Sequence, residues 1–237
     1  MIYLDNAAST PCLECVMDAM YDANRQWSNV HRGFHRYASV TTGRFEEARG
    51  QVADFIGADP EEIVFTSGTT DALNMVAHGL GLGRGDTILV TQMDHHSNIV
   101  PWQYRDCRVE FVKIVDGCLD CDHLETLLKK RPRVVAFPAV SNVLGTANPV
   151  TTIARMAHEY GVFTVVDAAQ SVPHIPHHVH NMDVDFLAFS GHKLHGPTGV
   201  GVLYARKDNF KKLGVMTLPR PSQTSWGGHL LSTHLVT

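Results

Sequence analysis

Seven short apolar runs, separated by helix-like segments, constrain the fold of this chain more than any other feature. Most of these runs are apolar at consecutive positions, so both faces of each strand must be covered, as is typical of a largely parallel sheet. Their alternation with helical patterns predicts an α/β domain, a mostly parallel seven-stranded sheet with helices on both faces. The predicted strands span residues 63–66, 87–91, 109–114, 133–138, 162–167, 184–190 and 200–205.

A helical pattern precedes the first strand. Residues 44–56 place four apolar side chains at helical spacing, and Gly57 follows as a C-cap. We expect this helix to pack onto the sheet through that face. The four side chains are Phe45, Ala48, Val52 and Phe55.

Length and charge narrow the class of protein. A chain of 237 residues buries a substantial core, which favours one large domain over residues 1–237. A net charge of -4 argues against binding to nucleic acid or to a membrane surface. No apolar stretch has the length of a membrane span, and the five cysteines form no small-scaffold disulfide pattern. We therefore expect a cytoplasmic protein with a small-molecule partner.

Polar residues follow several of the strands, where ligands bind in sheets of this kind. After the first strand, Ser67-Gly68-Thr69-Thr70 opens a helix, and a small-residue turn at a helix N-terminus offers N–H and hydroxyl groups to a phosphate. The same residues also suit a simple N-cap. After the second strand, His95 is placed to stack on a flat aromatic ring or to form an ordinary surface hydrogen bond.

Asp167 ends the fifth run, and Lys193 follows the sixth. A carboxylate at a strand end can hold a proton on a ring nitrogen, although it equally suits a metal or a ribose. Lys193 lies in Ser190-Gly191-His192-Lys193, ahead of a glycine-rich stretch. A lysine there has what an amine needs to bond covalently to a carbonyl ligand, namely partial desolvation and a nearby anion.

These motifs together resemble the class V aminotransferase group of fold-type I pyridoxal-phosphate enzymes, and within it the cysteine desulfurase and selenocysteine lyase family. His95-His96-Ser97-Asn98-Ile99-Val100-Pro101-Trp102-Gln103 is most similar to the SUF-type branch. The resemblance spans nearly the whole chain. Its other motifs are Tyr3-Leu4-Asp5-Asn6-Ala7-Ala8, Asn29-Val30-His31-Arg32-Gly33, Ser67-Gly68-Thr69-Thr70, Ser141-Asn142-Val143-Leu144-Gly145, Asp167-Ala168-Ala169-Gln170 and Ser190-Gly191-His192-Lys193.

The resemblance implies a role for each motif residue. Lys193 would bond to the pyridoxal-phosphate cofactor, Asp167 would pair with its pyridine nitrogen, and His95 would stack over its ring. Asn142 and Gln170 would face the ring's phenolic oxygen and the substrate. The phosphate would be held by Thr69, Thr70, Ser190 and His192.

The resemblance also implies a reaction and partners. The reaction is conversion of cysteine to alanine with transfer of sulfur to an enzyme thiolate, and a sulfur-acceptor protein is a possible further partner. A homodimer is implied because Gly227 and Gly228 resemble a stretch that approaches the cofactor phosphate across a dimer interface. Residues 1–30 form an N-terminal segment of the cofactor-binding large domain.

We expect the small C-terminal domain of the family to be largely absent, with a truncated end at residues 220–237. The family's nucleophilic cysteine and its substrate-binding arginine both belong to that region. Apolar surface that the small domain or a partner covers should then be exposed, so low solubility or dependence on dimerisation is predicted.

The remaining cysteines and histidines receive no functional assignment. Two C-x-x-C pairs, at 12–15 and 118–121, lie too far apart for a compact zinc module, and both are predicted at helix starts. We predict no metal site. The histidines at 174, 177, 178 and 180 are predicted to lie in a solvated connection.

Two other functions remain open at this point. One is another class V activity, such as transamination or selenocysteine cleavage. The other is a catalytically inactive remnant that serves as a dimerisation or binding module. A nicotinamide site at residues 79–83 is excluded, because its glycines follow a helix whereas the fingerprint requires a strand before it.

Overall fold

A single seven-stranded sheet forms the centre of the computed structural model, which describes residues 2–31, 33–210, 212 and 213. The strand order is β1-β9-β8-β7-β6-β2-β3. Neighbours from β8 to β3 are parallel, whereas β9 runs antiparallel to β1 and β8. The strands are β1 (Ile63–Thr66), β2 (Thr87–Thr91), β3 (Arg108–Val112), β6 (Val134–Pro138), β7 (Phe163–Asp167), β8 (Phe186–Ser190) and β9 (Gly201–Ala205).

All seven predicted strands are present; the last four begin one or two residues later than predicted, and the third differs most. The run at 109–114 divides into β3 and a short hairpin strand, β4 (Ile114–Val115), which pairs with β5 (Cys118–Leu119). Asp116 and Gly117 join them with positive φ angles of 51° and 78°. This Asp-Gly turn closes the hairpin. The run itself divides at Lys113, because the N–H groups of Lys113 and Ile114 donate to the side chains of His123 and Gln92.

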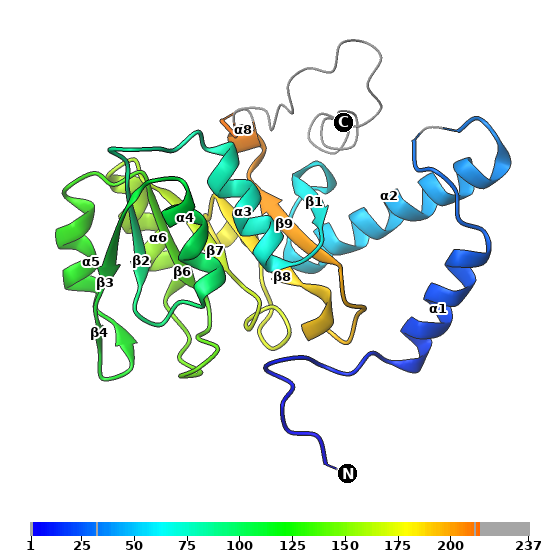
Figure 1. Cartoon of the computed structure of the whole chain (residues 1–237), viewed down its shortest axis with the longest axis horizontal. Helices are drawn as coiled ribbons and strands as arrows, with labels where there is room; N and C mark the ends of the chain where they lie inside the picture. The colour runs from blue at the N-terminus through cyan, green and yellow to red at the C-terminus, as the bar shows by residue number, and fades with distance from the viewer. Residues whose placement is uncertain (1, 32, 211, 214–237) are drawn as a thin grey trace.

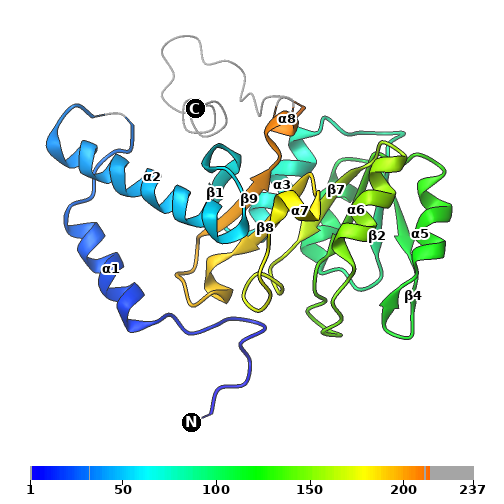
Figure 2. The same cartoon turned by 180° about the vertical axis from the view of Figure 1, so that it is seen from behind.

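Helices cover both faces of the sheet (Figures 1 and 2). Side chains of α3 and α4 pack into the core on one face, and side chains of α2, α5, α6 and α7 pack on the other. The predicted α/β architecture is therefore confirmed. The helices are α1 (Glu14–Arg25), α2 (Arg36–Ile56), α3 (Thr69–Gly79), α4 (Val100–Tyr104), α5 (Cys121–Leu128), α6 (Val150–Glu159), α7 (Val179–Met182) and α8 (Lys207–Phe210).

The helix predicted at 44–56 is longer than expected and buries only part of the predicted face. It begins at Arg36, and it ends at Gly57, whose φ of 67° confirms the predicted C-cap. The buried side chains near its end are Ala53 and Ile56, while Phe55 is 57% exposed. Two residues of the predicted face do reach the sheet side, because Val52 packs against the core and the Phe45 ring centroid lies 5.2 Å from that of Phe65 in β1. The prediction was wrong for Ala48 and Phe55, which are exposed. Figure 1 shows that α2 meets the sheet near its C-terminal end.

Helix α1 lies away from the sheet and has no buried residue (Figure 1). Its apolar side chains are accordingly exposed, with Met17 at 50% and Tyr21 at 67%, and Trp27 just beyond the helix at 69%. An uncovered apolar surface is thus present at this end of the molecule. No helix in the described part of the chain is long and apolar enough to cross a membrane.

A polar cluster ties helix α6 to the amino ends of β7 and β8. His158 Nε2 lies 2.8 Å from Asp185 Oδ2, and His158 Nδ1 lies 3.2 Å from Asp183 Oδ2. The Asp185 carboxylate also accepts hydrogen bonds from the Thr164 N–H, the Thr164 hydroxyl and the Asn209 amide. The hydrogen bond to Asp185 raises the pKa of His158 even though burial opposes it.

The ion pairs of His158 should make stability depend on pH. Because folding raises this pKa, the charge on His158 contributes fully to the free energy of unfolding below about pH 6.5, and the contribution is lost as pH rises through the raised pKa. We expect His158→Gln to lower the free energy of unfolding by about 1 kcal/mol more at about pH 6 than at about pH 9. Urea denaturation at both pH values measures the difference.

The matched control is His174→Gln. His174 is exposed, and its side chain makes no hydrogen bond within the described residues, so its replacement should have the same small effect at both pH values. If His158→Gln were equally destabilising at both pH values, the ion pairs would not govern stability.

Candidate active site

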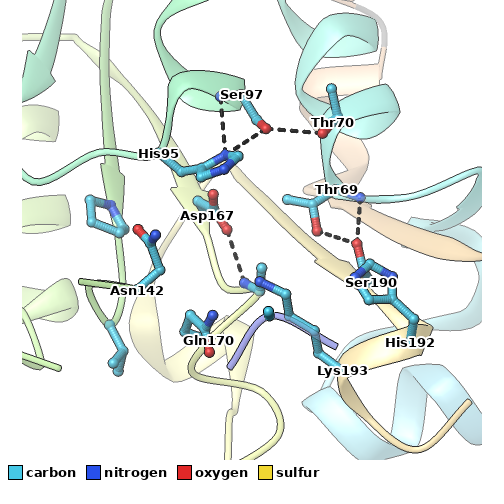
Figure 3. Close-up of a pocket in the computed structure, with 14 residues that line it drawn as sticks. Thr69, Thr70, His95, Ser97, Asn142, Asp167, Gln170, Ser190, His192 and Lys193 are labelled. Carbon is cyan, nitrogen blue, oxygen red and sulfur yellow. Dashed lines mark hydrogen bonds between the residues drawn. The ribbon is translucent and has the colours of Figure 1, made fainter. Parts of the chain in front are cut away.

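Loops at one edge of the sheet enclose a cavity of about 250 Å³ (Figure 3). They follow the carboxyl ends of β1, β2, β6, β7 and β8, which the parallel arrangement brings to a common edge. All nine predicted cofactor-binding residues line this cavity. They are Thr69, Thr70, His95, Asn142, Asp167, Gln170, Ser190, His192 and Lys193.

Hydroxyl groups gather at one side of the cavity, where helix α3 begins. Ser190 Oγ accepts a hydrogen bond from the Thr69 backbone N–H at 2.8 Å and lies 2.6 Å from Thr69 Oγ1. Thr70 Oγ1 lies 3.0 Å from the hydroxyl of Ser97. This side therefore combines hydroxyl donors with the positive end of a helix, which is the chemistry that binds phosphate.

The turn before α3 needs close backbone contact between neighbouring strands. A Cβ placed on Gly201, at the start of β9, would lie 2.4 Å from the Cα of Gly68. Only glycine at this position leaves room for the turn that precedes Thr69.

Asp167 supplies a buried carboxylate to the cavity. It is 7% exposed, and one of its oxygens accepts a hydrogen bond from the Ala169 N–H at 2.9 Å. Burial raises its pKa, while the Ala169 hydrogen bond and the charge of Lys193 act in the opposite direction. A cationic N–H group inside the cavity would stabilise this carboxylate.

Lys193 is the amine of the site, carried by the short turn Gly191–Lys193 after β8. Burial lowers the pKa of Lys193, and the charge of Asp167 only partly opposes this shift. Its Nζ makes no hydrogen bond or salt bridge with any residue that the structure describes. A larger fraction of the Lys193 amine is therefore neutral than for an exposed lysine. The lone pair of Nζ is then available to a carbonyl ligand.

His95 and Ser97 line the cavity together (Figure 3). Its Nδ1 is 2.7 Å from Ser97 Oγ and accepts a hydrogen bond from the Ser97 N–H at 3.2 Å. Burial, followed by the neighbouring charges of His96 and Lys193, lowers the pKa of His95. The imidazole at this position is consequently held in its neutral form at neutral pH.

The N-terminal segment closes another side of the cavity. Ala8 lines it, and the Ala7 carbonyl accepts a hydrogen bond from Gln170 Nε2 at 2.6 Å. The Thr10 N–H donates to the carbonyl of His192, and the Thr10 hydroxyl donates to that of Lys193. These bonds hold the lysine turn against the segment.

Two residues that line the cavity, Ala8 and Ser97, received no role from the sequence. Ala8 and Ser97 stood in quoted motifs but were not assigned to the site. Ser97 carried a usable signal, because a hydroxyl two residues after a histidine in a tight turn can reach the ring. The prediction for Gly227 and Gly228 lies outside the described residues.

The remaining cysteines and histidines have structural positions. All five cysteines are free and none lines the cavity, and Cys118 lies in β5 rather than at a helix start, because the Asp-Gly turn creates a hairpin there. His180 bonds to the buried Glu62 at 2.7 Å and His177 to Ser171 at 2.9 Å, so neither is merely solvated. Among the described residues, Glu62, His180 and Asp59 form the one cluster with the spacing of metal ligands.

Comparison with known proteins identifies the class of this fold and site. Residues 2–228 match the model of the family described as aminotransferase class-V, so the chain belongs to that family. Members of this family depend on pyridoxal phosphate.

Within the class, similar proteins include cysteine desulfurases. One from Haloferax volcanii is 44% identical over 90% of this chain and 53% of its own length, and one from Enterobacter sp. is 45% identical over 88% and 54%. The apo structure of a cysteine desulfurase from Thermococcus onnurineus superposes with a TM-score of 0.84 at 43% identity, covering 89% of this chain and 55% of that one. The chain thus spans about half the length of these relatives.

The donor groups of the cavity fit pyridoxal phosphate. The amine of Lys193 suits its aldehyde, the buried carboxylate of Asp167 suits its pyridine nitrogen, and the hydroxyls at the start of α3 suit its phosphate. Each of these groups comes from a different loop, yet all line a single cavity.

The contact between Gly201 and Gly68 generates a prediction. We expect Gly201→Ala to destabilise the fold by about 1–3 kcal/mol and to weaken pyridoxal-phosphate binding at least about tenfold, because the added Cβ displaces the turn before Thr69. A cofactor titration followed by absorbance, together with urea denaturation, measures both effects. Gly83→Ala is the control, since a Cβ there meets no atom within 4 Å. Equal affinities and stabilities for the two variants would contradict the prediction.

Proposed function

We propose that this chain binds pyridoxal phosphate covalently through Lys193 and serves the removal of sulfur from cysteine. The observation that carries the proposal is the half-buried amine of Lys193, which shares one cavity with the buried carboxylate of Asp167 and the hydroxyls at the start of α3. Similarity to cysteine desulfurases at 44–45% identity supports the choice of reaction.

Three side chains would perform the steps that the proposed reaction shares with other class V reactions. When bound, the cofactor supplies an electron sink for bonds broken at the substrate α-carbon. Asp167 would hold a proton on the ring nitrogen, because its buried carboxylate gains most from a cationic partner. Lys193, once the substrate amine had displaced it from the cofactor, would take up the substrate α-proton on Nζ, which its lowered pKa suits. His95 would cover the ring.

The sulfur step requires a thiol. In the balanced reaction, cysteine and a thiol give alanine and a persulfide, so the C–S bond breaks as an S–S bond forms. None of the five cysteines lines the cavity. We propose that the accepting thiol approaches the cavity from another part of the whole protein or from an acceptor protein.

The same observation favours a second candidate. A cavity without a thiol suits a pyridoxal-phosphate protein that binds amino acids but carries out another class V reaction, or none. In this case the cofactor would bind through Lys193 and no sulfide would be released from cysteine.

We further propose a cytoplasmic homodimer. The proposal of a dimer is supported by the exposed apolar side chains of α1, which include Met17 and Tyr21. The proposed location is supported by five cysteines that are all free, as is usual in a reducing compartment.

Replacing Lys193 tests the cofactor site. We expect wild-type protein with pyridoxal phosphate to develop a visible absorption band that is stable to gel filtration, and Lys193→Ala to lack it. The exposed Lys113 offers the control Lys113→Ala, which should keep the band. A band of equal intensity in Lys193→Ala would contradict the assignment.

Adding cysteine tests the reaction. Release of alanine in the presence of an added thiol, dependent on Lys193, is the expected result. A Lys193-dependent band with no alanine or sulfide released would contradict the desulfurase proposal and support the second candidate.

The proposed dimer has its own measurement. Sedimentation velocity should show a dimer, and Met17→Glu with Tyr21→Glu should shift it toward monomer, because charges on the exposed face of α1 oppose its burial. A monodisperse wild-type monomer at micromolar concentration would contradict the proposal.

A further inference from the structure

One ring nitrogen of His95, Nδ1, is hydrogen-bonded within the protein. The backbone N–H of Ser97 donates to His95 Nδ1 at 3.2 Å. A backbone N–H can only donate, so Nδ1 must be the accepting, unprotonated nitrogen. In the neutral imidazole, the proton must then reside on Nε2.

The hydroxyl of Ser97 reinforces this arrangement. It is buried, with Ser97 only 6% exposed, and its Oγ lies 2.7 Å from His95 Nδ1. Because Nδ1 accepts, the Ser97 hydroxyl donates its single proton there. Thr70 Oγ1, at 3.0 Å, is then the donor to Ser97 Oγ. Figure 3 shows this chain of bonds from Thr70 to His95.

The backbone around the ring is also fixed. The Asn98 N–H donates to the His95 carbonyl at 2.8 Å, and the Asn98 carbonyl accepts from Trp102 Nε1 at 2.8 Å. The carboxylate of Asp94 accepts from the Thr91 hydroxyl at 2.7 Å and from Asn98 Nδ2 at 2.8 Å. Hydrogen bonds on both sides of His95 therefore hold the turn. Rotation of the ring by 180° would break the two hydrogen bonds between Nδ1 and Ser97.

From this geometry we propose that Ser97 is a positioning residue that fixes the tautomer of His95. Its N–H and hydroxyl together hold the proton on Nε2, so that His95 offers an N–H donor and no basic nitrogen to a ligand in the cavity. Thr70 extends the arrangement to the hydroxyl side of the cavity, so the orientation of His95 is coupled to the start of α3. The inference concerns the chain alone and holds whichever reaction the site performs.

Nitrogen NMR of histidine-labelled protein without cofactor tests the proposal directly. The two ring nitrogens of His95, identified by the signals that disappear in His95→Gln, should show one neutral tautomer with the proton on Nε2. In Ser97→Ala, which loses the hydroxyl donor but keeps the backbone N–H, we expect the pKa of His95 to rise, because its neutral form loses a hydrogen bond. Ser97→Thr retains the hydroxyl and should restore the wild-type pattern.

Ser39→Ala is the matched control, because Ser39 is exposed on α2 and its replacement should leave the His95 signals unchanged. Circular dichroism establishes that each variant is folded. A wild-type His95 with its proton on Nδ1 would overturn the proposal even if no variant folded. Identical His95 tautomer and pKa in wild type and Ser97→Ala would also overturn it.

Discussion

Burial of the central strands β6, β7 and β8 between two helical layers is the interaction on which the rest of the structure depends. These strands are buried at every position except the first residue of β7, so they need helices on both faces. Parallel pairing then brings their carboxyl ends to one edge. The loops that follow must meet there, and this places Asn142, Asp167 and Lys193 around one cavity although they are far apart in the sequence.

Burial also sets the chemistry of the cavity. The same loss of water raises the pKa of Asp167 and lowers those of Lys193 and His95. The charge of Asp167 and the charge of Lys193 each oppose the effect of burial on the other residue's pKa, but burial remains the larger cause for both. A ligand that brings a carbonyl group, a cationic ring nitrogen and a phosphate would complement all of these groups together, and that combination describes pyridoxal phosphate.

The chain is similar to cysteine desulfurases over part of their length. The chain matches about half the length of its relatives and contains the whole set of residues expected to hold the cofactor. Its five cysteines all lie away from the cavity. The described residues thus supply the donor groups expected for the cofactor, and no thiol among them lines the cavity.

The sequence by itself determined the seven strands, because continuous apolar runs bounded by turns are local patterns. It also predicted nine candidate site residues, each at or just beyond the end of a strand, and the structure brings all nine to one cavity. The tertiary structure alone decided which face of α2 is buried, because a helical pattern does not say where the helix meets the sheet. It alone decided that the Thr70 hydroxyl reaches that of Ser97, and that His158 pairs with Asp185. These contacts join residues that are distant in the sequence, and only the packing of helices against the sheet sets the distances between them.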